Sequence, residues 1–385
     1  MSKLLTLFRH CEIVALTTAI LQVVGFAVAF RYWLSVGPAA AALVVAGAAF
    51  QRFVASGYGR MARPAPKRAA EMRGQLAVVT GGNTGIGFET AKSLLQRQVR
   101  VVLACRSRAR GEEAVKKLAE QVPGVVAGQH VRLAIVDMAS QKSVRNFAER
   151  ELPACLGVQS LDEVTIDMLV NNAGLFTPAR TLTEDRIEST VAINHVSPFL
   201  LTELLLPAVK RGGVNGSGGR VVCVASIAHF KTRGIDPALR PKSIERALDL
   251  SRTFAFAPYY DLSKLCNVMH AAYLAKDHGV AAFSVHPGGV LTEVFRRIPV
   301  IETLLFTFNK WALKTPMEGA QTTLHCLYGD VTDAPLSAVP HGSEALVPGG
   351  YYADCRLFEK CRRQVTRDAE ELKNFVAWSK HACGL

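Results

Sequence analysis

A glycine-rich turn between an apolar strand and a helix constrains the possible folds of this 385-residue chain more than any other feature. The turn covers residues 80–87 and has the sequence TGGNTGIG. The apolar run 76–79 before it is typical of a buried strand, and the pattern over 88–95 after it is helical. In such a strand–turn–helix unit, backbone N–H groups and the helix N-terminus attract phosphate. The segment therefore predicts a binding site for the pyrophosphate of a dinucleotide.

A tyrosine and a lysine later in the chain supply chemistry that suits such a cofactor. Tyr260 and Lys264 are spaced so that a helix presents them on one face, one turn apart. A phenol has a reference pKa of about 10, and a cation beside it lowers that pKa towards a range useful for acid–base catalysis. The Tyr-x-x-x-Lys spacing alone occurs by chance in many helices. Together with the glycine turn, it predicts hydride transfer at an alcohol or a carbonyl.

The rest of the core alternates between strands and helices. This alternation predicts an α/β fold, a Rossmann-like, doubly wound parallel sheet with right-handed crossovers. Ligands of such sheets bind at the carboxyl ends of the strands, and Asn171, Ser226 and His286 fall just beyond expected strand ends. Beyond the glycine unit, strands are expected at 99–104, 131–136, 168–170, 220–225 and 281–285, and helices at 110–121, 144–152, 187–209 and 260–277.

In these motifs and in their order, the chain resembles the short-chain dehydrogenase/reductase family over residues 74–353. Residues 80–87 match the family's T-G-x-x-x-G-x-G, and residues 171–174 match its N-N-A-G. The segments 104–106 and 225–229 are similar to those of the retinol-dehydrogenase branch, which also holds several less-characterised dehydrogenase/reductases. The resemblance implies an oxidoreductase.

The resemblance also implies a catalytic tetrad of Asn194, Ser226, Tyr260 and Lys264. Tyr260 exchanges a proton with the substrate oxygen, and Ser226 hydrogen-bonds that oxygen. Lys264 binds the nicotinamide ribose, and Asn194 holds a water that connects Lys264 to solvent. The competing interpretation of Ser226 and Asn194 is structural, because small polar residues often cap strands and helices.

The cofactor contacts implied by the resemblance are spread over several segments. Asp137 contacts the adenine, and the segment from Pro287 to Thr292 closes over the nicotinamide. No metal site is expected, because the nine cysteines lack paired spacing. The full set of expected cofactor contacts is Gly81, Asn83, Thr84, Gly85, Ile86, Gly87, Arg106, Asp137, Asn172, Ala173, Gly174, Tyr260, Lys264, Pro287, Gly288 and Thr292.

The end of the second strand predicts which dinucleotide is bound. An NAD site usually places an acidic residue there, to bind the ribose 2′-hydroxyl. This chain has Arg106, with Arg108 and Arg110 nearby. A guanidinium attracts a 2′-phosphate, so the expected cofactor is NADP(H). The alternative is that Arg106 merely lies in a solvated loop.

The N-terminal part carries two apolar runs that are candidates for membrane spans. Residues 13–30 and 34–50 are apolar, and Arg31 stands between them. Basic residues precede the first run and cluster over 52–73 after the second. In a hairpin, both basic segments lie on the cytosolic side, as the positive-inside rule prefers. A single long span, a secretory signal and a buried pair of soluble helices are the competing interpretations.

These features divide the chain into a membrane anchor at 1–56 with one or two transmembrane segments, a basic linker at 57–73 and a catalytic domain at 74–385. The net charge of +13 fits a basic collar beside a membrane, and no nucleic-acid motif accompanies it. The expected location is the endoplasmic reticulum or a lipid droplet, with the catalytic domain facing the cytosol. A homodimer is left open.

The expected substrate is a lipophilic small molecule, interconverted between alcohol and aldehyde or ketone. The apolar segment 298–308 lies where the family places a substrate lid, although an ordinary core helix has the same pattern. Retinoids are the first expectation, isoprenoid or fatty aldehydes the second and steroids the third. A membrane-tethered nucleotide-binding or scaffold protein without turnover is the alternative, because fold does not dictate activity.

Four departures from the family pattern concern the loops rather than the catalytic groups. Gln98 stands where glycine is common, and Ser197-Pro198 replaces a Gly-His type pair and is expected to reshape its helix locally. The segment 231–256 is enlarged, and 155–164 is expected to be a surface insertion.

Overall fold

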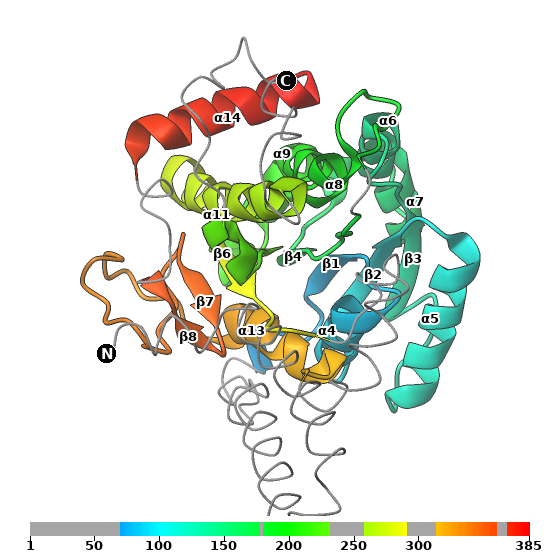
Figure 1. The fold of residues 1–385 in the computed structure, drawn as a ribbon. Helices are drawn as coiled ribbons and strands as arrows, with labels where there is room; N and C mark the ends of the chain where they lie inside the picture. The colour runs from blue at the N-terminus through cyan, green and yellow to red at the C-terminus, as the bar shows by residue number, and fades with distance from the viewer. Residues whose placement is uncertain (1–69, 178–179, 232–257, 291–312, 360–367) are drawn as a thin grey trace, which may run out of the picture.

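The computed structural model describes residues 70–177, 180–231, 258–290, 313–359 and 368–385. The described residues form an eight-stranded sheet in the order β3-β2-β1-β4-β5-β6-β7-β8 (Figure 1). Neighbouring strands are parallel except for the antiparallel pair β7–β8. The strands are β1 (Leu76–Thr80), β2 (Arg100–Cys105), β3 (Val131–Ile135), β4 (Met168–Asn171), β5 (Arg220–Val224), β6 (Ala281–His286), β7 (Tyr351–Ala353) and β8 (Arg356–Leu357).

Helices cover both faces of this sheet (Figure 1). The strand order reverses between β1 and β4, which is where doubly wound sheets bind ligands. One face is covered by α4 (Gly85–Leu95), α5 (Arg108–Gln121) and α13 (Pro316–Tyr328). The other is covered by α6 (Gln141–Asn146), the π-helical turn η1 (Phe147–Glu151), α7 (Leu152–Leu156), α8 (Ser189–Val191), the π-helical turn η3 (Ala192–Val196), α9 (Ser197–Arg211), α11 (Pro258–His278) and α14 (Ala369–Cys383).

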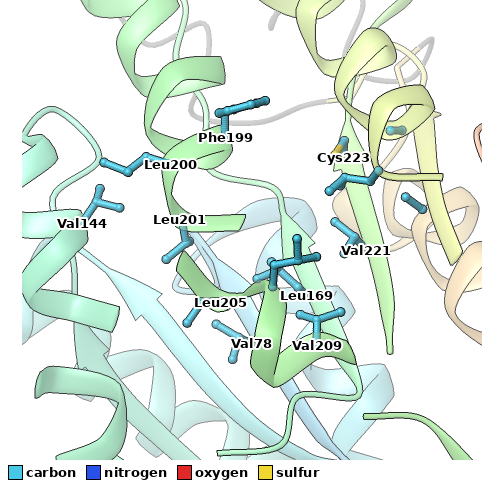
Figure 2. Close-up of a cluster of buried hydrophobic side chains, with 14 of the residues drawn as sticks. Val78, Val144, Leu169, Phe199, Leu200, Leu201, Leu205, Val209, Val221 and Cys223 are labelled. Atoms are coloured by element: carbon cyan, nitrogen blue, oxygen red, sulfur yellow. The ribbon is translucent and has the colours of Figure 1, made fainter. Parts of the chain in front are cut away.

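The core on the second face is built around α9. Val78, Leu169 and Val221, from three neighbouring strands, belong to the same buried cluster as Leu205 and Val209 of this helix (Figure 2). All of these side chains are fully buried, so they contribute the hydrophobic free energy that fixes α9 on the sheet. The continuous helix 189–211 is long and apolar enough to span a bilayer, but its most apolar window is 78% buried inside the domain. Its apolarity is therefore that of a core helix.

The expected doubly wound sheet is confirmed, with element boundaries shifted by a few residues. Asn171 and His286 are the last residues of β4 and β6 rather than the first residues beyond them. The expected anchor at 1–56 and the segments 232–256 and 298–308 lie outside the described residues.

The segment 155–164 lies at the surface, as the sequence suggested, but it also packs against the core. Val164 is buried, and the apolar side chains before it are partly buried and pack against the core. The guanidinium of Arg211, at the end of α9, donates to the carbonyl oxygens of Leu161 and Val164 at 2.8 Å each. The segment is therefore held by a helix terminus and by apolar burial together.

Gln98 closes the turn between α4 and β2 in a conformation that suits glycine. Its φ is +61°, in the left-handed region. Both backbone polar groups of Gln98 are hydrogen-bonded: its N–H donates to the Leu95 carbonyl at 2.9 Å, and its carbonyl accepts from the Gly74 N–H at 2.9 Å. The turn keeps the geometry of a glycine position although the side chain is glutamine, so it carries strain.

Gln98→Gly should therefore stabilise the protein, by about 0.5–1 kcal/mol, because removing the Cβ strain outweighs the extra chain entropy of glycine. Urea unfolding of the two proteins measures the difference. The matched control is Gln96→Gly, at an exposed residue with φ of −58°, where glycine should destabilise by a similar amount. Equal losses at both positions would contradict the strain at Gln98.

Candidate active site

A cleft of about 450 Å³ opens at the carboxyl ends of the strands. It is lined by most of the residues that the sequence singled out, although they come from segments far apart in the chain. Gly87 and Asn194 do not line it, and Thr292 lies outside the described residues. The expected site residues in its lining are Gly81, Asn83, Thr84, Gly85, Ile86, Arg106, Asp137, Asn172, Ala173, Gly174, Ser226, Tyr260, Lys264, Pro287 and Gly288.

The glycine turn forms one wall of the cleft and needs its glycines for space and for backbone angle. Gly81 and Gly85 have φ of +63° and +59°. A Cβ on Gly87 would lie 2.5 Å from the side-chain Nδ2 of Asn172 and 2.5 Å from the carbonyl oxygen of Gly81. The helix α4 begins at Gly85, and the Thr84 side chain makes no cap hydrogen bond to it. The turn therefore brings backbone and a helix N-terminus to the cleft, as a pyrophosphate requires.

A buried hydroxyl joins this turn to the segment after β4. Thr80 Oγ1 donates to the carbonyl of Val170 at 3.1 Å and accepts from the N–H groups of Asn172 and Ala173 at 3.0 Å each. The Asn172 side chain donates back to the Thr80 carbonyl at 2.9 Å. Thr80 thus uses its donor and both lone pairs. The sequence motif includes this residue, but its role as a junction could not be seen without the structure.

Tyr260 and Lys264 lie on α11 and both line the cleft. The ammonium of Lys264 is 5.4 Å from the centre of the Tyr260 ring, and it donates to the carbonyl oxygen of Val224 at 2.9 Å. Phe176 meets the same ring edge-on, with 5.6 Å between centroids. The phenol is thus set between a buried cation and an apolar aromatic side chain.

Ser226 follows β5 and is fixed through its backbone. The ring Nδ1–H of His229 donates to the Ser226 carbonyl at 2.6 Å, and the Ser226 hydroxyl accepts from the N–H of Ala228 at 3.2 Å. The N–H of Ile227 donates to Nδ1 of His286 at 3.3 Å. Both histidines are buried, so they serve here as supports of the serine loop.

Asn194 supports the cleft from behind. Its amide makes two hydrogen bonds with the backbone of Leu175, at 2.7 and 2.9 Å, and donates to Ser263 Oγ at 3.1 Å. Ser263 Oγ in turn donates to the carbonyl of Tyr260 at 2.8 Å. A Cβ on Gly174 would lie 3.2 Å from Asn194 Oδ1 and 3.6 Å from the Lys264 ammonium. Asn194 therefore links the segment after β4 to the first turn of α11.

The expected local change near Pro198 is the π-helical turn η3, which contains Asn194. Proline has no N–H to offer the carbonyl of the residue four positions earlier, and here that residue is Asn194. The next side chain, His195, is fully buried, hydrogen-bonds Ser379 Oγ at 3.0 Å and stacks on Trp378 at 5.6 Å. Burial lowers the pKa of His195 to about 3, so this ring is neutral and structural.

Positive charge gathers where β2 ends. Arg106, Ser107 and Arg110 all line the cleft, and the Ser107 hydroxyl caps α5 by accepting from the N–H of Arg110 at 3.4 Å. Asp137, after β3, accepts from the N–H of Ala139 at 2.9 Å and lines the same end. The sequence noted Arg110 only as a neighbour, whereas the first turn of α5 brings it into the cleft.

Sequence reasoning assigned no role to Lys314 or Asp354, which form a buried ion pair behind the Gly288 segment, with 2.5 Å between Nζ and Oδ1. They are 40 residues apart, and neither belongs to a motif that the sequence showed.

Within the described residues, no group of three or more histidine, cysteine, aspartate or glutamate side chains could hold a metal ion.

Comparison with known proteins identifies the family of this chain. The family model described as short chain dehydrogenase matches residues 75–236. Retinol dehydrogenase 12 of Mus musculus is 34% identical over 310 residues, which cover 79% of this chain and 85% of that protein. Dehydrogenase/reductase SDR family member 13 of Homo sapiens is 36% identical over 324 residues, which cover 83% of this chain and 76% of that protein.

Among solved structures, an uncharacterised protein from Mycobacterium paratuberculosis superposes with a TM-score of 0.54 at 25% identity, covering 82% of this chain and 97% of that one. The chain belongs to the short-chain dehydrogenase/reductase family, in its retinol-dehydrogenase-like branch. It is thus an oxidoreductase whose family takes a nicotinamide cofactor, NAD or NADP. The glycine turn, with no room for a Cβ at Gly87, fits such a dinucleotide.

Proposed function

We propose that this protein is a membrane-anchored, NADP(H)-dependent oxidoreductase that interconverts a lipophilic alcohol and its aldehyde or ketone. The observation that carries the proposal is a single cleft that combines the glycine turn with Ser226, Tyr260 and Lys264. A dinucleotide cradle and a proton-transfer group must share one site if a hydride and a proton are to be exchanged with the same substrate.

Tyr260 is the acid or base of this proposal. In reduction its phenol donates a proton to the carbonyl oxygen, and in oxidation the phenolate accepts one from the alcohol. The buried ammonium of Lys264 stabilises the phenolate form, and Ser226 offers a hydrogen bond to the same substrate oxygen. The bound nicotinamide supplies or accepts the hydride. Asn194 acts on this group through Ser263, which holds the backbone of Tyr260.

Tyr260→Phe should lower turnover by at least about 10²-fold and leave cofactor affinity unchanged, because it removes only the proton-transferring oxygen. The measurement is NADPH consumption with an apolar aldehyde, beside cofactor titration. Tyr259→Phe is the matched control, since this neighbouring phenol packs against the core and does not line the cleft. If Tyr260→Phe keeps most of its activity, the assigned acid–base group is wrong.

The preference for NADP(H) rests on charge at the adenine end of the cleft. Arg106 and Arg110 both line it where an NAD site usually has an acidic side chain. A guanidinium pairs with the phosphate on the ribose 2′-oxygen, and a carboxylate at that place would repel it.

Arg106→Asp should erase or reverse the preference for NADP(H) over NAD(H), because attraction to the 2′-phosphate becomes repulsion. The measurement is the dissociation constant of NADP(H) and of NAD(H) for the unaltered protein and for the Arg106→Asp variant. Arg108→Asp is the control, since Arg108 is exposed, does not line the cleft and pairs only loosely with Glu112 at 4.0 Å. Equal affinity of the unaltered protein for the two cofactors would sink this part of the proposal.

The proposed substrate is apolar, with a retinoid as the first candidate, isoprenoid or fatty aldehydes as the second and steroids as the third. The relatives named retinol dehydrogenase support the first candidate, and the apolar side chains of Leu175, Phe176, Ile193 and Val290 in the cleft support an apolar substrate. Such side chains suit a hydrocarbon chain better than a polar sugar. The proposed partners are thus a lipophilic small molecule and a membrane, with no nucleic acid and with a homodimer left open.

The proposed attachment is an N-terminal hairpin over 1–56, with residues 57–73 as a basic linker and the catalytic domain at 74–385 facing the cytosol, at the endoplasmic reticulum or a lipid droplet. The two apolar runs and the basic residues that flank them support this arrangement. Holding the cleft beside a bilayer would let an apolar substrate enter without crossing water.

A chain that begins at Gly57 should leave the membrane but keep activity toward a short soluble aldehyde, since the first strand of the described residues starts at Leu76. Activity toward a long lipid aldehyde in vesicles should fall more. Protease treatment of sealed microsomes carrying the full chain tests orientation. A catalytic domain that stays protected until detergent is added would face the lumen, against the hairpin.

A further inference from the structure

A buried lysine lies directly behind the part of the cleft that follows β6. The Lys314 side chain is 5% exposed, and its ammonium is 2.5 Å from Oδ1 of Asp354, whose side chain is 14% exposed. An ammonium removed from water must be paired, because an isolated buried charge costs several kcal/mol. Lys314 is therefore held in one position by Asp354.

Lys314 contacts the Gly288–Val290 segment by its backbone and by its side chain. Its N–H donates to the Gly289 carbonyl at 2.8 Å, and it forms an isolated parallel bridge with Val290. A Cβ on Gly288 would lie 2.8 Å from Cδ and Cε of Lys314. The Gly288 backbone, with φ of +92°, thus rests on the methylene stem of the lysine.

Asp354 is itself fixed relative to the strand that leads into this segment. It lies in the tight turn between β7 and β8, where both Asp354 and Cys355 have positive φ. Ala353, the residue before it, pairs with His286, which immediately precedes Pro287. These contacts connect β6 to itself by two routes. Along the chain, β6 leads to Gly288, which rests on Lys314, and Lys314 pairs with Asp354. Asp354 in turn follows β7, which pairs with β6.

We infer that the Lys314–Asp354 pair positions Gly288 and Gly289 against the nicotinamide half of the dinucleotide, with Lys314 as a positioning residue that does not touch the cofactor. The inference rests on the proposed function, which puts a dinucleotide in the cleft. Gly288 and Gly289 line the cleft together with Tyr260 and Lys264, whereas Arg106 follows β2, which is separated from β6 by three strands of the sheet. The ion pair should therefore act on one half of the cofactor only.

The test compares the whole cofactor with its adenine half. Lys314→Met, Asp354→Asn and the double variant are titrated with NADPH and with adenosine 2′,5′-bisphosphate, and thermal unfolding is recorded for each. Methionine keeps an apolar stem, and asparagine tolerates positive φ, so neither substitution disturbs the local backbone. NADH and ADP replace the two probes if the unaltered protein prefers NAD(H).

Each single variant should bind NADPH at least roughly tenfold more weakly, equivalent to about 1.4 kcal/mol, and bind adenosine 2′,5′-bisphosphate as the unaltered protein does. Each should also melt earlier, because the ion pair between Lys314 and Asp354 is broken. The double variant, in which neither member of the pair is charged, should regain melting temperature but not NADPH affinity. This separation of stability from affinity distinguishes positioning from a merely structural role.

Arg220→Met is the matched control, since Arg220 is a buried cation that donates to the carbonyls of Cys326 and Gly329 at the far end of α13. It should lower stability without a difference between the two probes. The inference is overturned if the double variant regains NADPH affinity with stability, or if both probes weaken equally. An unaltered protein that binds neither NADPH nor NADH would overturn the proposed function itself.

Discussion

The hydrogen bond from the Lys264 ammonium to the carbonyl oxygen of Val224 is the contact on which the candidate site depends. At 2.9 Å it ties α11, which carries Tyr260, to the end of β5, two residues before Ser226. Asn267, one turn further along α11, donates to the same carbonyl at 3.1 Å. Because a buried ammonium without a partner is costly, the bond fixes helix and strand ends together. The side chains of Tyr260, Lys264 and Ser226 are thereby held in fixed positions relative to one another.

Two neighbouring residues, Asn194 and His195, contact different parts of the molecule: the first supports the cleft and the second packs in the core. Asn194 turns towards Leu175 and Ser263, while His195 turns into a buried cluster with Ser379 and Trp378. The helix between α8 and α9 thus joins the site to the C-terminal helix α14. Burial keeps the His195 ring neutral, so the cluster adds packing and a hydrogen bond without adding charge.

The doubly wound sheet, the glycine turn and the tyrosine–lysine pair could be predicted because their patterns are local: apolar runs, glycine spacing and one helical turn. Lys314 and Asp354 could not, because their pairing depends on a hairpin and a parallel bridge that bring together residues 40 positions apart. The segment 155–164 lies at the surface as predicted, but its sequence did not show that its partly buried apolar side chains pack against the core. The sequence showed that Gln98 stands where the family commonly has glycine. Only its positive φ shows that the turn keeps the glycine conformation and is therefore strained.

The proposed function requires that this cleft transfers a hydride as well as binding a nucleotide. The most direct test incubates the purified full-length protein in lipid vesicles with retinal and NADPH carrying deuterium at both C4 positions, followed by mass spectrometry of the products. We expect an alcohol that carries one deuterium, formed as NADPH is consumed. NADPH that binds but transfers no deuterium to retinal or to any aldehyde or ketone of an apolar panel would contradict it, and would indicate a nucleotide-binding protein without turnover.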